Sequence, residues 1–135
     1  MSPAFEAFLD DISRCFTLGN LSLWRRRLRL PFTLVAKDGP VVLETEAAVA
    51  ENFGHYQMAM DIMRIDLVHR RAISLEDCQD GVWLGTFETR LLSAGQLATT
   101  PYTATALLHL TEGHFLMSSM LNGRGHQEWT GVRGR

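Results

Sequence analysis

The hydrophobic period of the sequence changes from helical to extended within TEAAVAENFGHYQMAMDIMRIDLVHRRAISLEDC, residues 45–78. In the first half of this stretch apolar side chains recur every three or four residues, as on one face of a helix: Val49, Phe53, Tyr56, Met60 and Met63. Thr45, just before them, is a typical N-cap residue. From Asp66 onward the pattern is that of extended chain. We therefore expect a helix over Thr45–Met63 that leads directly into a strand.

The extended pattern continues through the C-terminal half of the chain. Four strand-like segments follow one another, over residues 66–78, 82–93, 98–110 and 114–122. Turn residues ending in glycine separate neighbouring segments: Gln79-Asp80-Gly81, Ser93-Ala94-Gly95 and Thr111-Glu112-Gly113. Long strands joined by tight turns predict an antiparallel meander.

The residues before Thr45 predict two helices and a hairpin. The first helix carries an apolar stripe from Phe5 to Phe16, with Ser2 as its N-cap and Gly19 as its stop. A short helix that contains Trp24 follows it. The hairpin joins two short strands, residues 32–36 and 41–43.

Composition and charge fit one globular domain in a reducing compartment. The chain has 135 residues, of which 46% are hydrophobic and 21% charged, and we place one domain at residues 1–122 and a polar tail at 123–135. A net charge of -2 argues against a nucleic-acid partner. No run approaches the roughly 18 apolar residues of a membrane span, and the N-terminus lacks the pattern of a secretory signal. We expect a cytoplasmic protein without membrane association, with Cys15 and Cys78 as thiols.

This order of elements resembles the nuclear transport factor 2-like superfamily, particularly its bacterial SnoaL-like (polyketide-cyclase-like) members. The segments that carry the resemblance are Phe5 to Phe16, Leu30-Pro31-Phe32-Thr33-Leu34 with Lys37-Asp38-Gly39-Pro40, Thr45 to Met63, and Tyr102 to Leu110 with His114 to Leu121. The resemblance implies an α+β fold of the cystatin-like type, in which helices pack on a strongly curved antiparallel sheet and form a conical pocket. It also implies a homodimer that forms through the sheet.

Large apolar and aromatic side chains are the expected walls of such a pocket, since ligand sites are mostly apolar with few polar groups. They could equally form the core. The candidates for ligand contact are Trp24, Phe32, Phe53, Tyr56, Trp83, Phe87, Tyr102 and Met117.

Arg71 is the sharpest polar candidate for the pocket, because alternation along residues 66–78 puts it on one face with His69 and with apolar neighbours. A guanidinium there would bind a carboxylate or an enolate. The alternative is an ion pair at a strand edge or in a dimer interface. Tyr56, His69 and Arg71 are the catalytic candidates, with Tyr56 as a hydrogen-bond donor to an oxygen of the substrate.

Other polar groups favour ordinary structural roles. Glu88 and Arg90 share a strand face that we expect to be solvated. His109 and His114 lack the spacing of a metal site, and we expect no metal and no cofactor. The cluster Arg25-Arg26-Arg27 with Arg29 is interpreted as a solvated helix end.

Two functions remain open from the sequence. The first is a small-molecule-binding domain with a mostly apolar pocket for an apolar or weakly anionic ligand, with cofactor-independent isomerase, dehydratase or cyclase activity as its enzymatic form. The second is a non-catalytic dimeric interaction module, whose apolar face would include Leu84, Leu92 and Leu108.

Overall fold

A computed structural model describes residues 2–36 and 39–122 of the chain, so the expected tail at 123–135 lies outside the described residues. The elements in chain order are α1 (Pro3–Leu18), α2 (Leu21–Arg26), β1 (Leu28–Ala36), β2 (Gly39–Leu43), α3 (Glu46–Met63), β3 (Leu67–Asp77), β4 (Val82–Ser93), β5 (Gln96–Leu97), β6 (Tyr102–Thr111) and β7 (His114–Asn122). The predicted order of helices and strands is confirmed, although β1 begins four residues before the predicted strand at Phe32.

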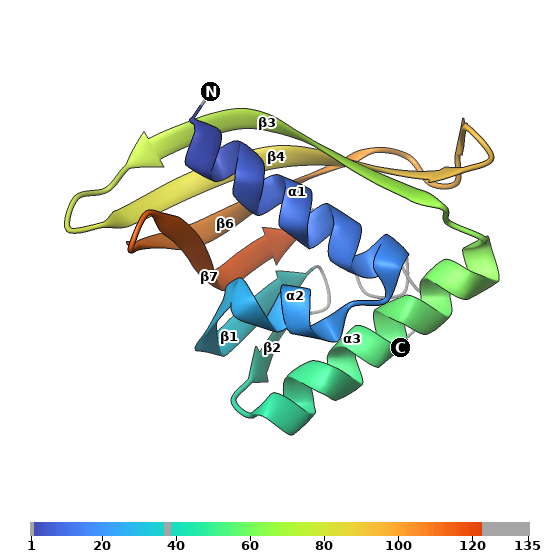
Figure 1. Cartoon of the computed structure of the whole chain (residues 1–135), viewed down its shortest axis with the longest axis horizontal. Coiled ribbons are helices and arrows are strands. Elements are labelled where there is room, and N and C mark those ends of the chain that lie inside the picture. The colour runs from blue at the N-terminus through green and yellow to red at the C-terminus, as the bar shows by residue number, and fades with distance from the viewer. Residues whose placement is uncertain (1, 37–38, 123–135) are drawn as a thin grey trace.

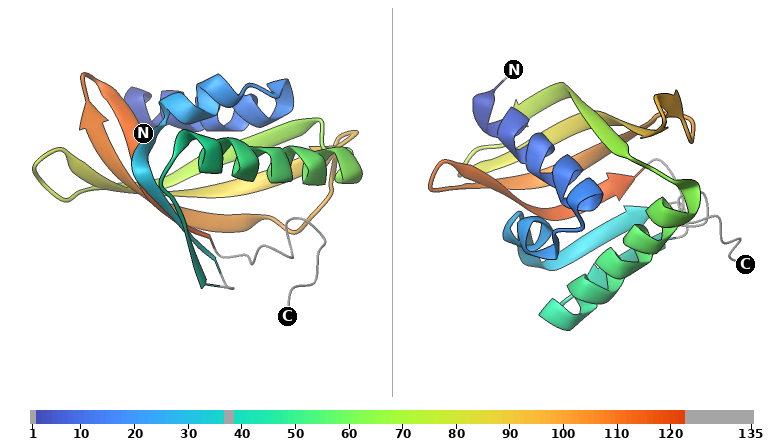
Figure 2. Two further views of the ribbon diagram at one scale, coloured as in Figure 1. Left: turned by 90° about the horizontal axis from the view of Figure 1, so that it is seen from below. Right: turned by 45° about the vertical axis from the view of Figure 1, so that its right-hand side comes forward.

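The strands form one curved sheet in the order β2-β1-β7-β6-β4-β3, with β5 paired to β4. The helices lie against one side of it (Figures 1 and 2). The α+β fold with a curved sheet is confirmed. The sheet is mixed, because β1 runs parallel to β7 while the other neighbours are antiparallel.

Side-chain caps fix where each helix starts. Ser2 Oγ accepts a hydrogen bond from the Phe5 amide at 3.3 Å, and Thr45 Oγ1 accepts one from the Ala48 amide at 3.1 Å. Asn20 caps α2 by accepting from the Leu23 amide at 3.0 Å. These bonds satisfy amides that have no partner inside the helix, so each cap positions the helix behind it.

The core lies between α1 and the central strands. The apolar stripe of α1 is buried as predicted, with Phe5, Phe8 and Ile12 fully enclosed. Gly85 on β4 permits this close approach, because a Cβ there would lie 2.7 Å from Phe5 Cε1 and 2.9 Å from Leu108 Cδ1. Leu108 is itself fully buried, so it does not belong to an outer apolar face as expected.

The expected faces of β3 are wrong by one position. Val68 is buried and Arg70 and Ala72 are half-buried on the side of the helices, whereas His69 and Arg71 are exposed on the outer side. A register shift between Ala72 and Ser74 then breaks the alternation of the strand. Apolar residues are a poor guide to the faces here for two reasons. Leu67 and Ile73 are 51% and 43% exposed, and Leu75 returns to the core only after this irregularity.

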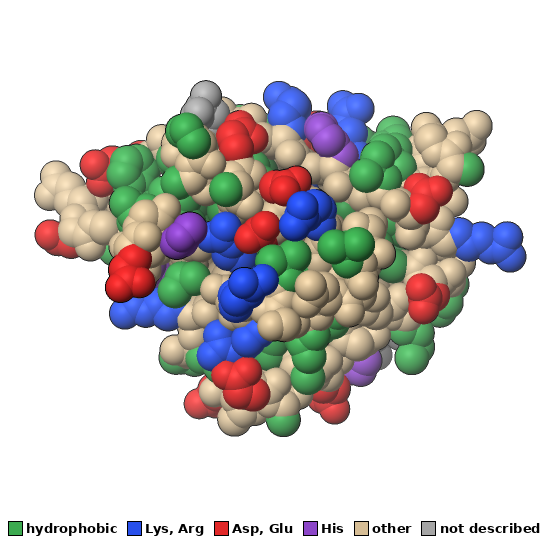
Figure 3. Space-filling model, viewed as in Figure 1, with side chains coloured by type: hydrophobic (Ala, Val, Ile, Leu, Met, Phe, Trp, Pro, Cys, Tyr) green, Lys and Arg blue, Asp and Glu red, His purple; other side chains and the backbone are tan. Residues whose placement is uncertain are grey.

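The surface carries no concentrated charge on the face that the helices cover. Figure 3 shows basic and acidic side chains interspersed over it. No helix in the described part of the chain is long and apolar enough to cross a membrane.

Candidate functional site

A small cavity lies between the three helices and strands β1, β3, β6 and β7. It has a volume of about 30 Å³ and is partly open to the surface. Since a water molecule needs about 10–15 Å³ of such space, the cavity has room for two or three waters or for a carboxylate group. Its lining is mostly apolar, with a few polar side chains: Phe16, Trp24, Phe32, Leu34, Asn52, Tyr56, Arg70, Tyr102, Met120 and Asn122.

Arg70 supplies the positive charge of this cavity. It stands on β3 in a row of paired residues that continues to Thr89 on β4 and Tyr102 on β6. Arg70 Nη1 donates a hydrogen bond to Thr89 Oγ1 at 2.9 Å, and its guanidinium carbon lies 5.7 Å from the centre of the Phe87 ring. Tyr102, the next residue of this row, lies close enough to Arg70 to raise the pKa of the guanidinium. The strand row therefore holds the guanidinium in place on the cavity wall.

The charge of Arg70 has no ionic partner within residues 2–36 and 39–122. Burial lowers the pKa of Arg70, and Tyr102 and the Cys15 thiol partly oppose this shift. Arginine nevertheless stays charged in proteins, so the site holds a half-buried cation with an enclosed Nε and no anionic partner among the described residues. A buried charge normally has a counter-charge or coordinates a ligand, so this cation indicates an anion-binding site.

Four buried polar atoms lack a hydrogen-bond partner among the described residues, and all belong to side chains that line this cavity. They are Trp24 Nε1, Asn52 Oδ1, Arg70 Nε and Asn122 Oδ1. They come from α2, α3, β3 and β7, which are distant in sequence. Most buried polar groups in proteins are hydrogen-bonded, so their convergence on one cavity indicates a place for a polar ligand.

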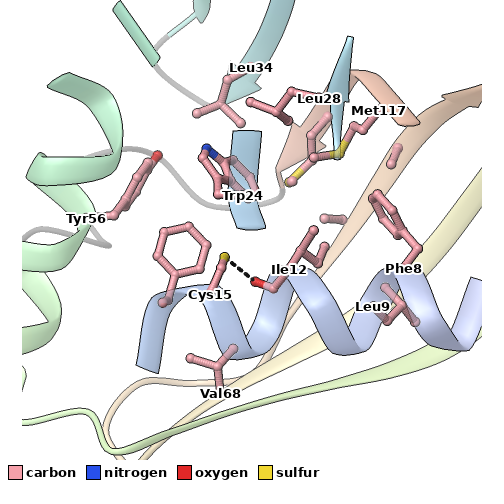
Figure 4. Close-up of a cluster of buried hydrophobic side chains, with 14 of the residues drawn as sticks. Phe8, Leu9, Ile12, Cys15, Trp24, Leu28, Leu34, Tyr56, Val68 and Met117 are labelled. Carbon is pink, nitrogen blue, oxygen red and sulfur yellow. Dashed lines mark hydrogen bonds between the residues drawn. The ribbon is translucent and has the colours of Figure 1, made fainter. Parts of the chain in front are cut away.

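Tyr56 of α3 also reaches the cavity. Burial, followed by the nearby Tyr102, raises the pKa of Tyr56 to about 12. Figure 4 shows its hydroxyl and the Trp24 indole nitrogen pointing into the same region. Tyr56 is therefore protonated at neutral pH, and its hydroxyl is able to donate a hydrogen bond. Cys15, deeper in the core, is also protonated, because burial raises its pKa to about 12.

The structure brings together half of the predicted pocket walls. Trp24, Phe32, Tyr56 and Tyr102 line the cavity. The other candidates lie behind it or elsewhere in the core. Phe53 stacks on Phe16 at a centroid distance of 5.0 Å, and Phe87 lies beneath the Arg70 guanidinium. Trp83 packs edge-on against Phe115, and Met117 is fully buried in the core.

Arg71 and His69 do not reach the cavity. Arg71 is exposed on the outer face, where its Nη2 lies 3.7 Å from Glu88 Oε1. Arg90 Nε donates to the same Glu88 oxygen at 3.0 Å, which lowers the pKa of Glu88. Arg71 therefore forms an ion pair on the strand, which was the alternative to a place in the pocket. The adjacent Arg70 lies in the pocket position that we expected for Arg71.

Arg70, Asn52 and Asn122 were not predicted as site residues. The sequence did carry a signal for Arg70. Val68 and Ala72 stand two residues before and after it, so all three lie on the same face of the strand, and both neighbours are apolar, as the side facing the helices requires. Asn52 lies four residues before Tyr56 and therefore on the same side of α3. The sequence offered no comparable signal for Asn122.

A serine–histidine pair on the outer face does not form a catalytic nucleophile. His109 Nε2 lies 2.7 Å from Ser118 Oγ, and Arg29 Nη1 lies 2.8 Å from His109 Nδ1. Because a guanidinium only donates, Nδ1 must accept and Nε2 must carry the proton. The imidazole therefore donates to Ser118 and cannot remove its proton, as a serine nucleophile requires.

The remaining polar clusters are structural. Arg27 donates to Asp11 Oδ2 at 2.9 Å and to the Phe115 carbonyl at 3.1 Å, which ties α2 to α1 and β7. Arg25 binds Glu46 at the start of α3. No group of three His, Cys, Asp or Glu side chains that could hold a metal ion occurs in the described segments.

No protein-family model matches this sequence, and no curated protein matches it. Several solved structures, however, have a similar fold. An NTF2-like protein of unknown function from Shewanella oneidensis MR-1 is 7% identical, with a TM-score of 0.69 over 89% of this chain and 96% of that one. A "putative dehydratase" of the NTF2-like family from Streptomyces avermitilis is 12% identical, with a TM-score of 0.63 over 90% and 94%. A "putative ketosteroid isomerase" from Shewanella frigidimarina NCIMB 400 is 10% identical, with a TM-score of 0.63 over 90% and 96%. At these identities the likeness shows the fold alone, which is the NTF2-like, cystatin-like fold.

Proposed function

We propose that this protein binds a small organic anion in the cavity, with Arg70 as the counter-charge. The observation that carries the proposal is the enclosed guanidinium whose Nε–H has no partner among the described residues. Arginine presents several N–H donors in a planar fork that matches a carboxylate. A carboxylate beside Arg70 would supply the missing anion and the missing acceptor together.

The size and the lining of the cavity narrow the kind of anion. The space of about 30 Å³ fits the carboxylate end of a molecule, and the partly open side leaves the remainder of the ligand free to extend outward. Phe16, Trp24, Phe32 and Leu34 supply apolar walls around that end. These features favour a monoanion with a small body over a multiply charged molecule such as a phosphate ester.

Catalysis is the second candidate, as a cofactor-independent isomerase, dehydratase or cyclase. Arg70 and the Tyr56 hydroxyl would stabilise negative charge on a substrate oxygen, as an oxyanion hole does. The neighbours named as a dehydratase and a ketosteroid isomerase share this fold. Such reactions need a general base, and no Asp, Glu or His lines the cavity within the described segments. Binding is therefore the function that the lining supports best.

Two neighbouring variants test the binding proposal. Arg70→Met removes the enclosed charge, and Arg71→Met removes the same charge from the exposed position next to it. We expect isothermal titration with propionate to show binding to the wild type and to Arg71→Met, and none to Arg70→Met. Equal binding by all three proteins, or binding by none of them, contradicts the proposal.

We also propose that the protein forms a homodimer through the outer face of the sheet. Leu84 and Leu107 are cross-strand neighbours on this face. Leu67 and Leu121 are exposed there by 51% and 57%. One uncovered sheet face with apolar residues is commonly covered by a second subunit. Sedimentation equilibrium tests this proposal, and a monomer at every concentration up to the millimolar range contradicts it.

A further inference from the structure

The unpartnered atoms of the cavity specify more than a negative charge. As oriented, they are two donors, Arg70 Nε–H and Trp24 Nε1–H, and two acceptors, the amide oxygens of Asn52 and Asn122. A carboxylate has two oxygens that accept hydrogen bonds and no donor. It can therefore satisfy both donors and neither amide. A ligand that completes this site needs a second polar group beside its carboxylate.

The small volume allows one ligand to reach these four side chains. All four side chains line the same space of about 30 Å³. A molecule whose carboxylate lies at Arg70 therefore brings the carbon next to that carboxylate within reach of the other walls. We place the second polar group on this neighbouring carbon, because the cavity holds little more than the carboxylate end of a ligand.

A hydroxyl is the substituent that fits the amides best. Each asparagine amide can present its oxygen or, after a half-turn, its NH₂ group. A hydroxyl both donates and accepts, so it can donate its one hydrogen to the oxygen of one amide and accept from the NH₂ group of the other amide after the half-turn of that amide. A ketone oxygen satisfies only the NH₂ orientation. An ammonium group would place a second positive charge beside Arg70, and no carboxylate among the described lining residues offsets it.

We infer that the ligand is a short 2-hydroxy monocarboxylate. This inference rests on the proposed function, since Arg70 must first bind the carboxylate. Arg70 and Trp24 hold the carboxylate oxygens, and Asn52 and Asn122 select the adjacent hydroxyl. Discrimination is expected to be large, because an analogue without the hydroxyl leaves a buried amide unpaired.

Isothermal titration with three acids of equal chain length tests the inference. The probes are propionate, both enantiomers of lactate, and alanine, which differ only in the substituent next to the carboxylate. We expect one lactate enantiomer to bind the wild type at least tenfold more tightly than propionate, and alanine not to bind. Equal affinities of lactate and propionate would overturn the inference and leave the proposed function standing. Absence of binding by every acid would overturn both.

Variants of the amides show whether the selectivity arises at this site. Asn52→Leu keeps the size of the side chain and removes its polar end. We expect it to bring the ratio of lactate affinity to propionate affinity within threefold, whereas Arg71→Met on the outer face keeps the full wild-type ratio. Asn122→Leu, on β7 rather than on α3, repeats the test on a second element. A tenfold ratio that persists in both variants would refute the assignment of the hydroxyl to the amides.

Discussion

Removing the enclosed charge should make the protein more stable. The perturbation is the double substitution Arg70→Met with Thr89→Val, which deletes the guanidinium and its hydroxyl partner on β4 together. Both replacements keep approximately the volume of the original side chains. Thr89 is fully buried, so Arg70→Met alone would leave its hydroxyl without the 2.9 Å bond. The double variant avoids that cost.

The magnitude follows from the groups that change. An unpaired buried donor such as Arg70 Nε–H costs about 1–3 kcal/mol, and this cost disappears in the variant. Loss of the interaction between Arg70 and Tyr102 costs about 1 kcal/mol and offsets part of this gain. Relief of the desolvation of the charge adds to the gain. We expect the free energy of unfolding to rise by about 1–2 kcal/mol and the Tm by roughly 3–8 °C.

Urea denaturation followed by circular dichroism measures this change in a buffer free of carboxylates, because a ligand would stabilise the wild type alone. Thr89→Val by itself should lower stability, since it leaves Arg70 with one bond fewer. Arg71→Met is the matched control and should stay within about 0.5 kcal/mol of the wild type. A loss of more than 1 kcal/mol in the double variant would refute the reasoning and make Arg70 a structural residue.

Three further predictions concern the fold around the site. Gly85→Ala should cost about 1–3 kcal/mol by chemical denaturation, because its Cβ would overlap Phe5 and force α1 outward; an unchanged stability would mean that α1 shifts freely. Arg27→Met should cost about 2–3 kcal/mol, because it leaves the half-enclosed Asp11 carboxylate without its partner, and a matched Arg14→Met on the exposed pair should cost much less. Burial and Arg29 lower the pKa of His109 below its ordinary 6.5. As the pH falls, the unfolded chain therefore takes up a proton at His109 at a higher pH than the folded protein does. Stability should fall as the pH drops below 6.5. His109→Gln should flatten this part of a urea-midpoint against pH profile, and an identical profile in both proteins would contradict the assignment.

The fold was predictable because its signals are local and mutually consistent. The N-caps Ser2 and Thr45 and the stop at Gly19 each act within a few residues of their helix. Hydrophobic period separated α3 from the strands that follow it. The parallel pairing of β1 with β7 was not predictable in this way, because it joins segments about 85 residues apart and leaves no local pattern.

The site was less predictable because it depends on strand faces and on exceptions to burial rules. Exposed Leu67 and Ile73 made the outer face of β3 resemble the inner one. The same reasoning that places apolar residues inside then places Arg71 inside and Arg70 outside. In the structure, the pairing of Arg70 with Thr89, a buried threonine on the next strand, distinguishes it from Arg71.

The position of Arg70 also explains why binding and stability should oppose each other here. A methionine at this position would pack against Phe87 without a desolvation cost, whereas the guanidinium is held beside that ring by Thr89 and Tyr102 and still leaves Nε unpaired. An arrangement that costs stability in the empty protein makes physical sense when an anion completes it, because the ligand then recovers the cost as binding energy. The rise in stability of the double variant and its loss of carboxylate binding should therefore occur together. A double variant that lost carboxylate binding without gaining stability would show that the affinity for the anion does not come from a stability cost in the empty protein.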